Sequence, residues 1–259
     1  MSIYEDLIQL HEDLIEFGSG IQSKSATKFK KEKHIESNVH AVFYKIIAYG
    51  IILHRATKTL CENGWTHVTP ILLRTIMECS VNCLAIIHND YAEYMAFKYF
   101  YHDYVEILRD NNSSHELKAK NLSDIEKGLE HIKNLAAKEK AVKFVENDKL
   151  EIFWFRPDES GVSSIIKKHG SDGLTLIYKS FSKSIHASHI GMFLLKDDPD
   201  NIEINPCENP VKTNLAIIIS CRLLLELINI RINYEDLGFD TEYKGFLERI
   251  LAFENKVRY

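Results

Sequence analysis

Apolar residues recur at helical spacing through most of this chain, and that pattern limits the fold more than any other feature. It is clearest near the start, where the apolar positions of residues 3–17 are Ile3, Leu7, Leu10, Leu14 and Phe17. Similar spacing marks residues 37–62, 70–87, 210–232 and 241–257. Because apolar positions three or four residues apart share one helix face, these segments are predicted to be helices that bury that face. Only 5 Pro and 11 Gly occur in 259 residues, which argues against a turn-rich all-β fold.

We predict an all-α fold, a single-domain multi-helix bundle over residues 1–259 with a small irregular or hairpin insertion near residues 192–206. Residues 1–34 are assigned to an N-terminal amphipathic helix, which Gly18 and Gly20 end, and a basic loop. Residues 37–232 form the core bundle and residues 233–259 the C-terminal helix. The lysine-rich loop, residues 22–34, is interpreted as solvated, with a phosphate-binding patch as the alternative.

Charge and cysteine content limit the binding partners and the cellular compartment that we expect for the protein. The net charge of −5 gives no global positive field that would draw the chain to nucleic acid or to an anionic membrane. The five cysteines are odd in number and include no C-x-x-C, which predicts reduced thiols in the cytoplasm. Arg222 and Glu226 interrupt the longest apolar run, so no membrane span and no membrane partner are expected.

Charged residues inside apolar helices are the most informative polar positions. Arg74, Glu78 and Asn82 follow one another at four-residue intervals in residues 70–87. Arg222 and Glu226 repeat the arrangement in residues 210–232. Since burying a charge is costly unless it is paired, each Arg–Glu pair is predicted either to fix helix packing or to belong to a functional pocket.

A third helix, predicted over residues 172–190, carries the remaining candidates. Tyr178, Ser182 and His186 lie at four-residue intervals, and His189 lies three residues after His186. These four side chains share one side of the helix and offer proton donors, acceptors and imidazole nitrogens together. We predict that the three polar faces meet, with Arg74, Glu78, Ser182 and His186 as catalytic residues. Tyr178, His189, Asn82, Arg222 and Glu226 are the predicted binding residues.

Sequence motifs for nucleotide, redox and metal chemistry are absent. The chain has no P-loop, no G-x-G-x-x-G, no H-E-x-x-H, no G-x-S-x-G and no E-x-x-H. No cofactor and no metal are therefore predicted. A single metal held by His186 and His189 with Glu78 or Glu226 is a lower-ranked alternative.

The pattern resembles a widespread bacterial family of helical proteins that has no functional name. The matching residues are Arg74 and Glu78, then Trp154, a short helix at residues 165–170, and Tyr178, Ser182 and His186. The resemblance covers roughly residues 40–232. It implies a helical fold, these site positions and a place in the mobile, defence-associated helical repertoire of bacteria.

A second resemblance is to the HEPN ribonucleases, which are also helical bundles. Their signature is an arginine, a polar residue and a histidine a few positions later. Arg109, Asp110 and His115 match it in form, although they lie in a predicted loop. One match of this kind is expected by chance in a chain with this many histidines.

Two functions remain open from the sequence. The first is a metal-independent ribonuclease acting as a defence or toxin-like effector, for example in phage defence, with RNA or a small phosphate-bearing ligand as its partner. The second is a non-catalytic binding or self-assembly module whose Arg–Glu–His cluster fixes packing or holds a small ligand. A homo-oligomer is expected in either case. The first hypothesis depends on Arg74 and His186 becoming neighbours in the fold.

Overall fold

The computed structural model describes residues 3–32, 37–88, 92–99, 162–169 and 210–257, with the single positions 127, 130, 134, 174 and 178. These residues form helices α1 (Ile3–Glu32), α2 (Asn38–Glu62), η1 (Thr66–Val68), α3 (Thr69–Ile87), α6 (Val162–His169), α9 (Pro210–Glu235) and α10 (Asp240–Val257). Residues 92–99 are helical as well, and none of the residues that the structure describes lies in a strand. The prediction of an all-α multi-helix fold is confirmed. The predicted hairpin near residues 192–206 lies outside the described residues.

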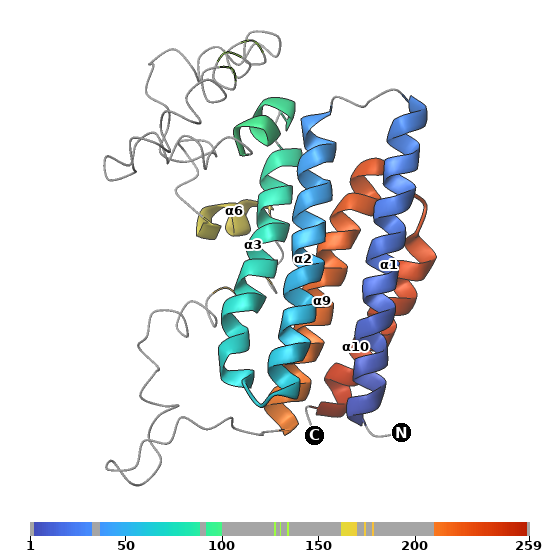
Figure 1. Ribbon diagram of the computed structural model, residues 1–259, viewed down its shortest axis with the longest axis vertical. Helices are drawn as coiled ribbons and strands as arrows, with labels where there is room; N and C mark the ends of the chain where they lie inside the picture. Colours follow the sequence, from blue (N-terminus) through green and yellow to red (C-terminus); the bar gives the residue numbers. More distant parts are fainter. Residues whose placement is uncertain are drawn as a thin grey trace, which may run out of the picture.

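The long helices lie nearly side by side (Figure 1). Helices α2, α3 and α9 pack against one another, while α1 and α10 both pack on α9, and α6 packs on α3. The end of α1 and the start of α2 lie at one end of the bundle, and the α2–α3 connection lies at the other. Helices from both ends of the chain therefore share one core.

Local signals explain where the central helices begin. The Ser37 hydroxyl accepts a hydrogen bond from the His40 backbone N–H at 3.2 Å, so Ser37 caps the N-terminus of α2. Pro70 lies in the first turn of α3, where its missing N–H costs nothing. Helix α2 ends at Glu62, and Gly64, two residues later, has a φ of 77° that suits a residue without a side chain.

The prediction that the first helix ends at Gly18 and Gly20 is wrong. Helix α1 continues to Glu32, through most of the predicted basic loop. A Cβ atom on Gly18 would lie 3.0 Å from Ile228 Cδ1 and 3.3 Å from Ile51 Cδ1. Gly18 thus allows α1 to approach α2 and α9 closely. In the sequence, a glycine that close packing requires looks the same as a glycine that ends a helix.

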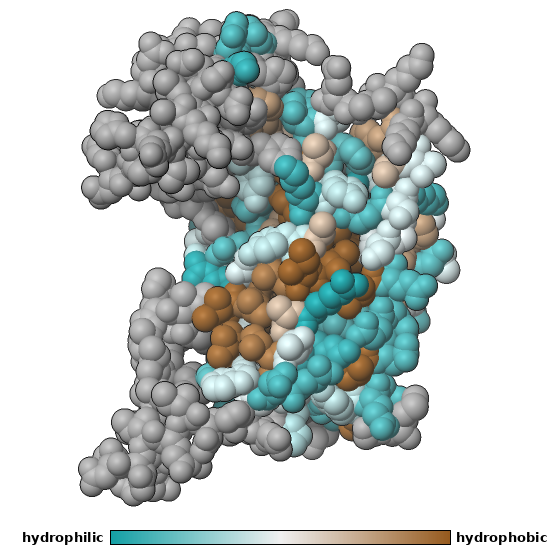
Figure 2. All heavy atoms as spheres, viewed as in Figure 1, coloured by the Kyte–Doolittle hydropathy of each residue, from teal (hydrophilic) through white to brown (hydrophobic). Residues whose placement is uncertain are grey.

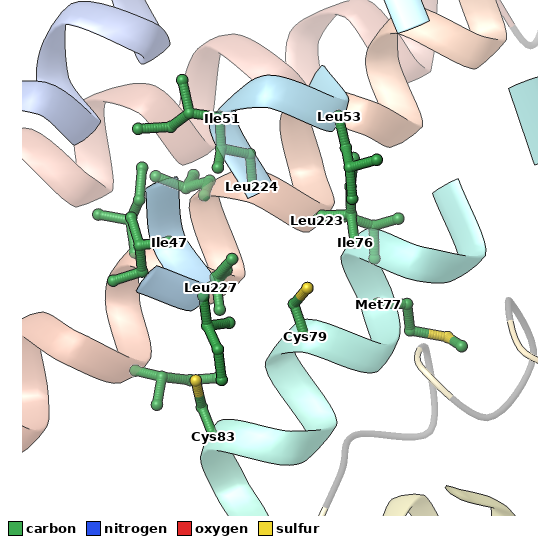
Figure 3. Packing of buried hydrophobic residues seen from close by; sticks show 14 of the residues in the cluster. Ile47, Ile51, Leu53, Ile76, Met77, Cys79, Cys83, Leu223, Leu224 and Leu227 are labelled. Carbon is green, nitrogen blue, oxygen red and sulfur yellow. The ribbon is translucent and has the colours of Figure 1, made fainter. Parts of the chain in front are cut away.

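Leucine, isoleucine and cysteine side chains of the three central helices make up much of the middle of the core. Figure 3 shows Ile47 and Ile51 of α2 beside Leu224 and Leu227 of α9, with Cys79 and Cys83 reaching from α3 into the same cluster. At Gly50 the approach of α2 to α9 is so close that an added Cβ would lie 2.6 Å from Leu227 Cδ2. The four described cysteines, Cys61, Cys79, Cys83 and Cys221, are free and buried.

Some apolar side chains remain on the surface. Figure 2 shows a patch of apolar atoms over the face where α2 and α3 lie in Figure 1. Large exposed apolar residues of these helices include Ile52, which is 60% exposed, and Ile71, which is 50% exposed. One described segment, Thr66–Ile87, is long and apolar enough to cross a membrane, and half of it is buried inside the bundle. Core helices of soluble proteins commonly share these properties, so the segment is weak evidence of a membrane span.

Candidate functional site

Arg74 and Glu78 form an ion pair on α3, and both side chains stay partly open to solvent. Their four-residue spacing places them on one face of the helix. Arg74 Nε donates to Glu78 Oε1 at 2.7 Å, and the side chains are 19% and 29% exposed. This bond uses only the Nε–H group of the guanidinium. No described residue forms a hydrogen bond with its terminal nitrogens Nη1 and Nη2.

Tyr178 lies against the same guanidinium. Arg74 Cζ is 5.2 Å from the centre of the Tyr178 ring, within the range of a cation–π contact. The ring and Glu78 together restrict the orientation of Arg74. The fold thus brings together three of the predicted site residues, one of them far from the others in the sequence.

Several predicted residues lie outside the described part of the chain. These are Ser182, His186 and His189, the Trp154 of the family pattern, and Arg109, Asp110 and His115 of the HEPN-like match. The predicted proximity of Arg74 and His186 therefore stays a prediction. Asn82 is described and lies half-buried one turn beyond Glu78 on α3.

Arg222 and Glu226 occupy a partly buried position on α9. Arg222 Nη1 is buried and has no hydrogen-bond partner among the described residues. Burial raises the pKa of the Glu226 carboxyl, and the nearby Arg222 charge opposes that rise. Among the described side chains, no hydrogen bond or ion pair joins these two residues to Arg74 or Glu78. Helices α3 and α9 pack together, but the two Arg–Glu pairs are not connected by described polar contacts.

A more deeply buried polar group, which was not predicted from the sequence, lies at the N-terminal end of α2. We name it the Arg231 cluster: Ser25 of α1, His40 of α2, and Arg231 and Glu235 of α9. The Arg231 side chain has no exposed surface. Its Nε donates to Glu235 Oε1 at 3.1 Å, and its Nη2 donates to Ser25 Oγ at 2.5 Å.

His40 completes the Arg231 cluster. Its Nδ1 lies 3.2 Å from Glu235 Oε1, and its ring stacks on Phe29 with centroids 3.6 Å apart. Burial tends to raise the pKa of the Glu235 carboxyl, but hydrogen bonding to His40 and the charge of Arg231 leave the pKa lowered overall. The signal that could have revealed the cluster is a third R-x-x-x-E, at residues 231–235, just beyond the longest apolar run.

Two lysines of the predicted basic loop bind the end of α9 instead of facing a ligand. Lys24 Nζ donates to the Leu237 carbonyl at 2.8 Å, and Lys28 Nζ donates to the Glu235 carbonyl. Ammonium groups stabilise a helix C-terminus because its last carbonyls carry partial negative charge. These lysines lie near the C-terminal end of α1, whereas Arg74 lies near the α2–α3 connection at the other end of the bundle.

In the described ranges, no three His, Cys, Asp or Glu side chains come close enough to hold a metal ion. The Arg74 guanidinium, which Glu78 and Tyr178 contact, instead offers donors suited to an anion.

Comparison with known proteins identifies the family but no characterised relative. Neither the curated proteins nor the solved structures contain a match to this chain. A family model matches residues 40–202, a range that includes Arg74, Glu78, Asn82, Tyr178, Ser182, His186 and His189. Because this match spans more than half of the chain, the protein belongs to DUF5677, a family of unknown function.

Proposed function

We propose that the protein is a metal-independent ribonuclease whose phosphate-binding residue is Arg74. The observation that carries this proposal is the orientation of Arg74, whose Nε is held by Glu78 while Nη1 and Nη2 have no described partner. A guanidinium held in this way presents a planar pair of donors that matches two phosphate oxygens. The partial exposure of both side chains leaves room for a ligand to approach.

The proposed mechanism gives each residue one role. Arg74 binds the scissile phosphate and stabilises the negative charge that develops on it. Glu78 and Tyr178 position Arg74 through the ion pair and the ring contact. His186 exchanges the proton with the attacking or leaving hydroxyl, and Ser182 orients the imidazole or the substrate. Asn82, His189, Arg222 and Glu226 are proposed to contact the substrate around this centre.

The test is cleavage of a labelled single-stranded RNA by the purified protein with a chelator present. Arg74→Ala and His186→Ala should each lower the rate by about 100-fold or more, as expected for lost charge stabilisation or lost proton transfer. Arg74→Lys should not restore it, because an ammonium group cannot donate to two oxygens in a fixed plane. Arg55→Ala removes an exposed arginine of α2 and serves as the matched control. Intact RNA, or an Arg74→Ala variant as active as the original, would contradict the proposal.

The biological setting proposed with this activity is a bacterial defence or toxin-like effector in the cytoplasm. The buried, free thiols support a reducing compartment. Expression of the original chain in bacteria should slow growth, and the Arg74→Ala variant should not. Equal growth with both would argue against the effector role.

The alternative is a non-catalytic binding or self-assembly module, and the surface of α2 and α3 favours it. Ile52 and Ile71 expose large apolar side chains, and a contiguous apolar patch on a soluble protein commonly marks an interaction site. The test is the mass in solution by light scattering, against 30.0 kDa for one chain. A dimer or larger species that Ile52→Asp converts to single chains would favour assembly through this face. A single chain at micromolar concentration would argue against it.

A further inference from the structure

Two buried histidines stack against each other where α1 meets α2. The rings of His11 and His54 have centroids 3.7 Å apart and an angle of 14° between their planes. His11 is 1% exposed and His54 has no exposed surface. On α1, His11 lies among Leu7, Leu10 and Leu14, which are fully buried. The pair therefore belongs to the interface that holds α1 on the bundle.

Each ring has one described hydrogen-bond partner, which satisfies a neutral imidazole but not a protonated one. His11 Nε2 lies 3.0 Å from the His54 carbonyl, and His54 Nδ1 lies 2.6 Å from Ser220 Oγ of α9. The other two nitrogens, His11 Nδ1 and His54 Nε2, are buried and have no hydrogen-bond partner among the described residues. A protonated imidazole donates from both nitrogens, so a proton on either ring would leave a buried charged donor unsatisfied.

The charged groups around the pair do not compensate such a proton. On α1, Glu12 Oε1 lies 3.8 Å from His11 Nδ1, but this exposed carboxylate already accepts from Lys58 Nζ of α2 at 2.6 Å. Helix α2 also brings Glu62 and the cation Arg55 near the rings. The described contact from α9 is the uncharged hydroxyl of Ser220. Burial lowers the pKa of both imidazoles, and the neighbouring His11 lowers that of His54 further.

From this geometry we infer that the His11–His54 pair is an acid-sensitive latch that releases α1 from α2 and α9 when the rings take up protons. The docked form excludes protons that the released form binds. As the pH falls below about 6.5, the ordinary pKa of histidine, each such proton favours the released form about tenfold per pH unit. With both rings involved, the ratio of released to docked chains rises by up to about 100-fold per pH unit.

Other contacts of α1 oppose this release, because Leu7, Leu10 and Leu14 are fully buried and Arg231 Nη2 of α9 donates to Ser25 Oγ. Acid therefore shifts the ratio of released to docked chains against these contacts. The described side-chain ion pairs that join α1 to other helices near the latch, Glu12–Lys58 and Asp13–Arg249, are exposed or partly exposed. Such pairs stabilise little in water. Release would uncover the leucine face of α1 and the surface of α2 and α9 beneath it.

The test is hydrogen exchange measured by mass spectrometry on the full chain between pH 7.5 and pH 5.0, corrected for the pH dependence of the intrinsic rates. The protection of α1 amides should fall at least tenfold over this range while α3 amides keep theirs. Protection of α1 that does not change with pH would overturn the inference. Equal loss in α1 and α3 would also overturn it, because it would mean global unfolding.

A variant and a control identify the groups responsible. His11→Phe/His54→Phe/Ser220→Ala keeps an aromatic ring at both positions and removes the titrating nitrogens of the pair, so the protection of α1 should lose its pH dependence. His88→Asn, which changes an exposed histidine after α3, should behave like the original chain. If the triple variant does not fold, imidazole proton NMR of the original chain tests the latch instead. Two histidines that stay neutral until α1 is released support the latch, and free titration of all histidines near pH 6.5 excludes it.

Discussion

Arg231 and Glu235 lie one turn apart on α9 and form an ion pair, 3.1 Å from Nε to Oε1, that the bundle encloses almost completely. The Arg231 side chain is 0% exposed and the Glu235 side chain 2%. Burial lowers the pKa of the guanidinium, and the charge of Glu235 opposes this effect. The pair joins α9 to Ser25 and His40, and so links three helices at one end of the bundle.

Breaking this pair from one side should be costly. Arg231→Met leaves the Glu235 carboxylate buried without its cation and should lower the free energy of unfolding by about 3–5 kcal/mol. The double variant Arg231→Met/Glu235→Leu removes both charges and should recover a large part of that loss. Urea denaturation of the two variants provides the comparison. A double variant as unstable as the single one would mean that the pair contributes through its shape rather than its charges.

Two glycines in helices offer a matched test of helix packing. Gly50→Ala places a methyl group 2.6 Å from Leu227 Cδ2 and should destabilise the fold by about 1–3 kcal/mol through overpacking. Gly20→Ala meets no atom within 4 Å and should stabilise α1 by about 0.5–1 kcal/mol, because alanine favours a helix. Thermal unfolding should therefore shift in opposite directions for the two variants. Shifts of the same sign would contradict this account of the α2–α9 contact.

The buried thiols should be unreactive in the folded protein. Burial raises the pKa of Cys61 to about 11 and that of Cys79 to about 12, so almost no reactive thiolate is present at neutral pH. In a Cys207→Ser background, which removes the one cysteine outside the described residues, a thiol reagent should label the native chain slowly. Four thiols should react at once after denaturation. Rapid labelling of the native chain would contradict the burial.

The same shifts predict the response to alkali. The pKa of these thiols is higher in the folded chain than the value of about 9 expected after unfolding. Their contribution to stability is therefore complete below pH 9 and is lost as the pH rises above it. The urea midpoint should fall between pH 9 and pH 11, and Cys79→Ala should reduce that fall. An unchanged dependence in Cys79→Ala would assign the effect to other groups.

The N-terminus of α2 depends on the Ser37 hydroxyl. This hydroxyl accepts from the His40 N–H and donates to Glu93 Oε1 at 2.6 Å. Ser37→Ala should lower the free energy of unfolding by about 1 kcal/mol, as is typical for loss of an N-cap. Ser37→Thr should keep most of the stability, whereas Ser37→Asp should not, because its carboxylate would face Glu93. Equal stability of the Ala and Thr variants would show that the cap contributes little.

Local signals were sufficient to predict four of the long helices that the structure describes. The segments predicted at residues 37–62, 70–87, 210–232 and 241–257 correspond closely to α2, α3, α9 and α10. Their caps, prolines and apolar spacing act within a few residues, so the sequence alone reveals them. The Arg74–Glu78 pair was predictable for the same reason, since four residues of helix bring the two side chains together.

The tertiary structure decided what depends on neighbours far along the chain. Gly18 and Gly20 resemble helix stops, yet α1 continues, because packing against Ile51 and Ile228 favours a glycine at position 18. Arg231, His11 and His54 look like surface residues in their helices, and only the docking of α1 on α2 and α9 buries them. The sequence determined which segments are helical and which face of each is apolar. Burial and polar contacts between helices followed only from packing, because they depend on distances between residues that the chain order does not fix.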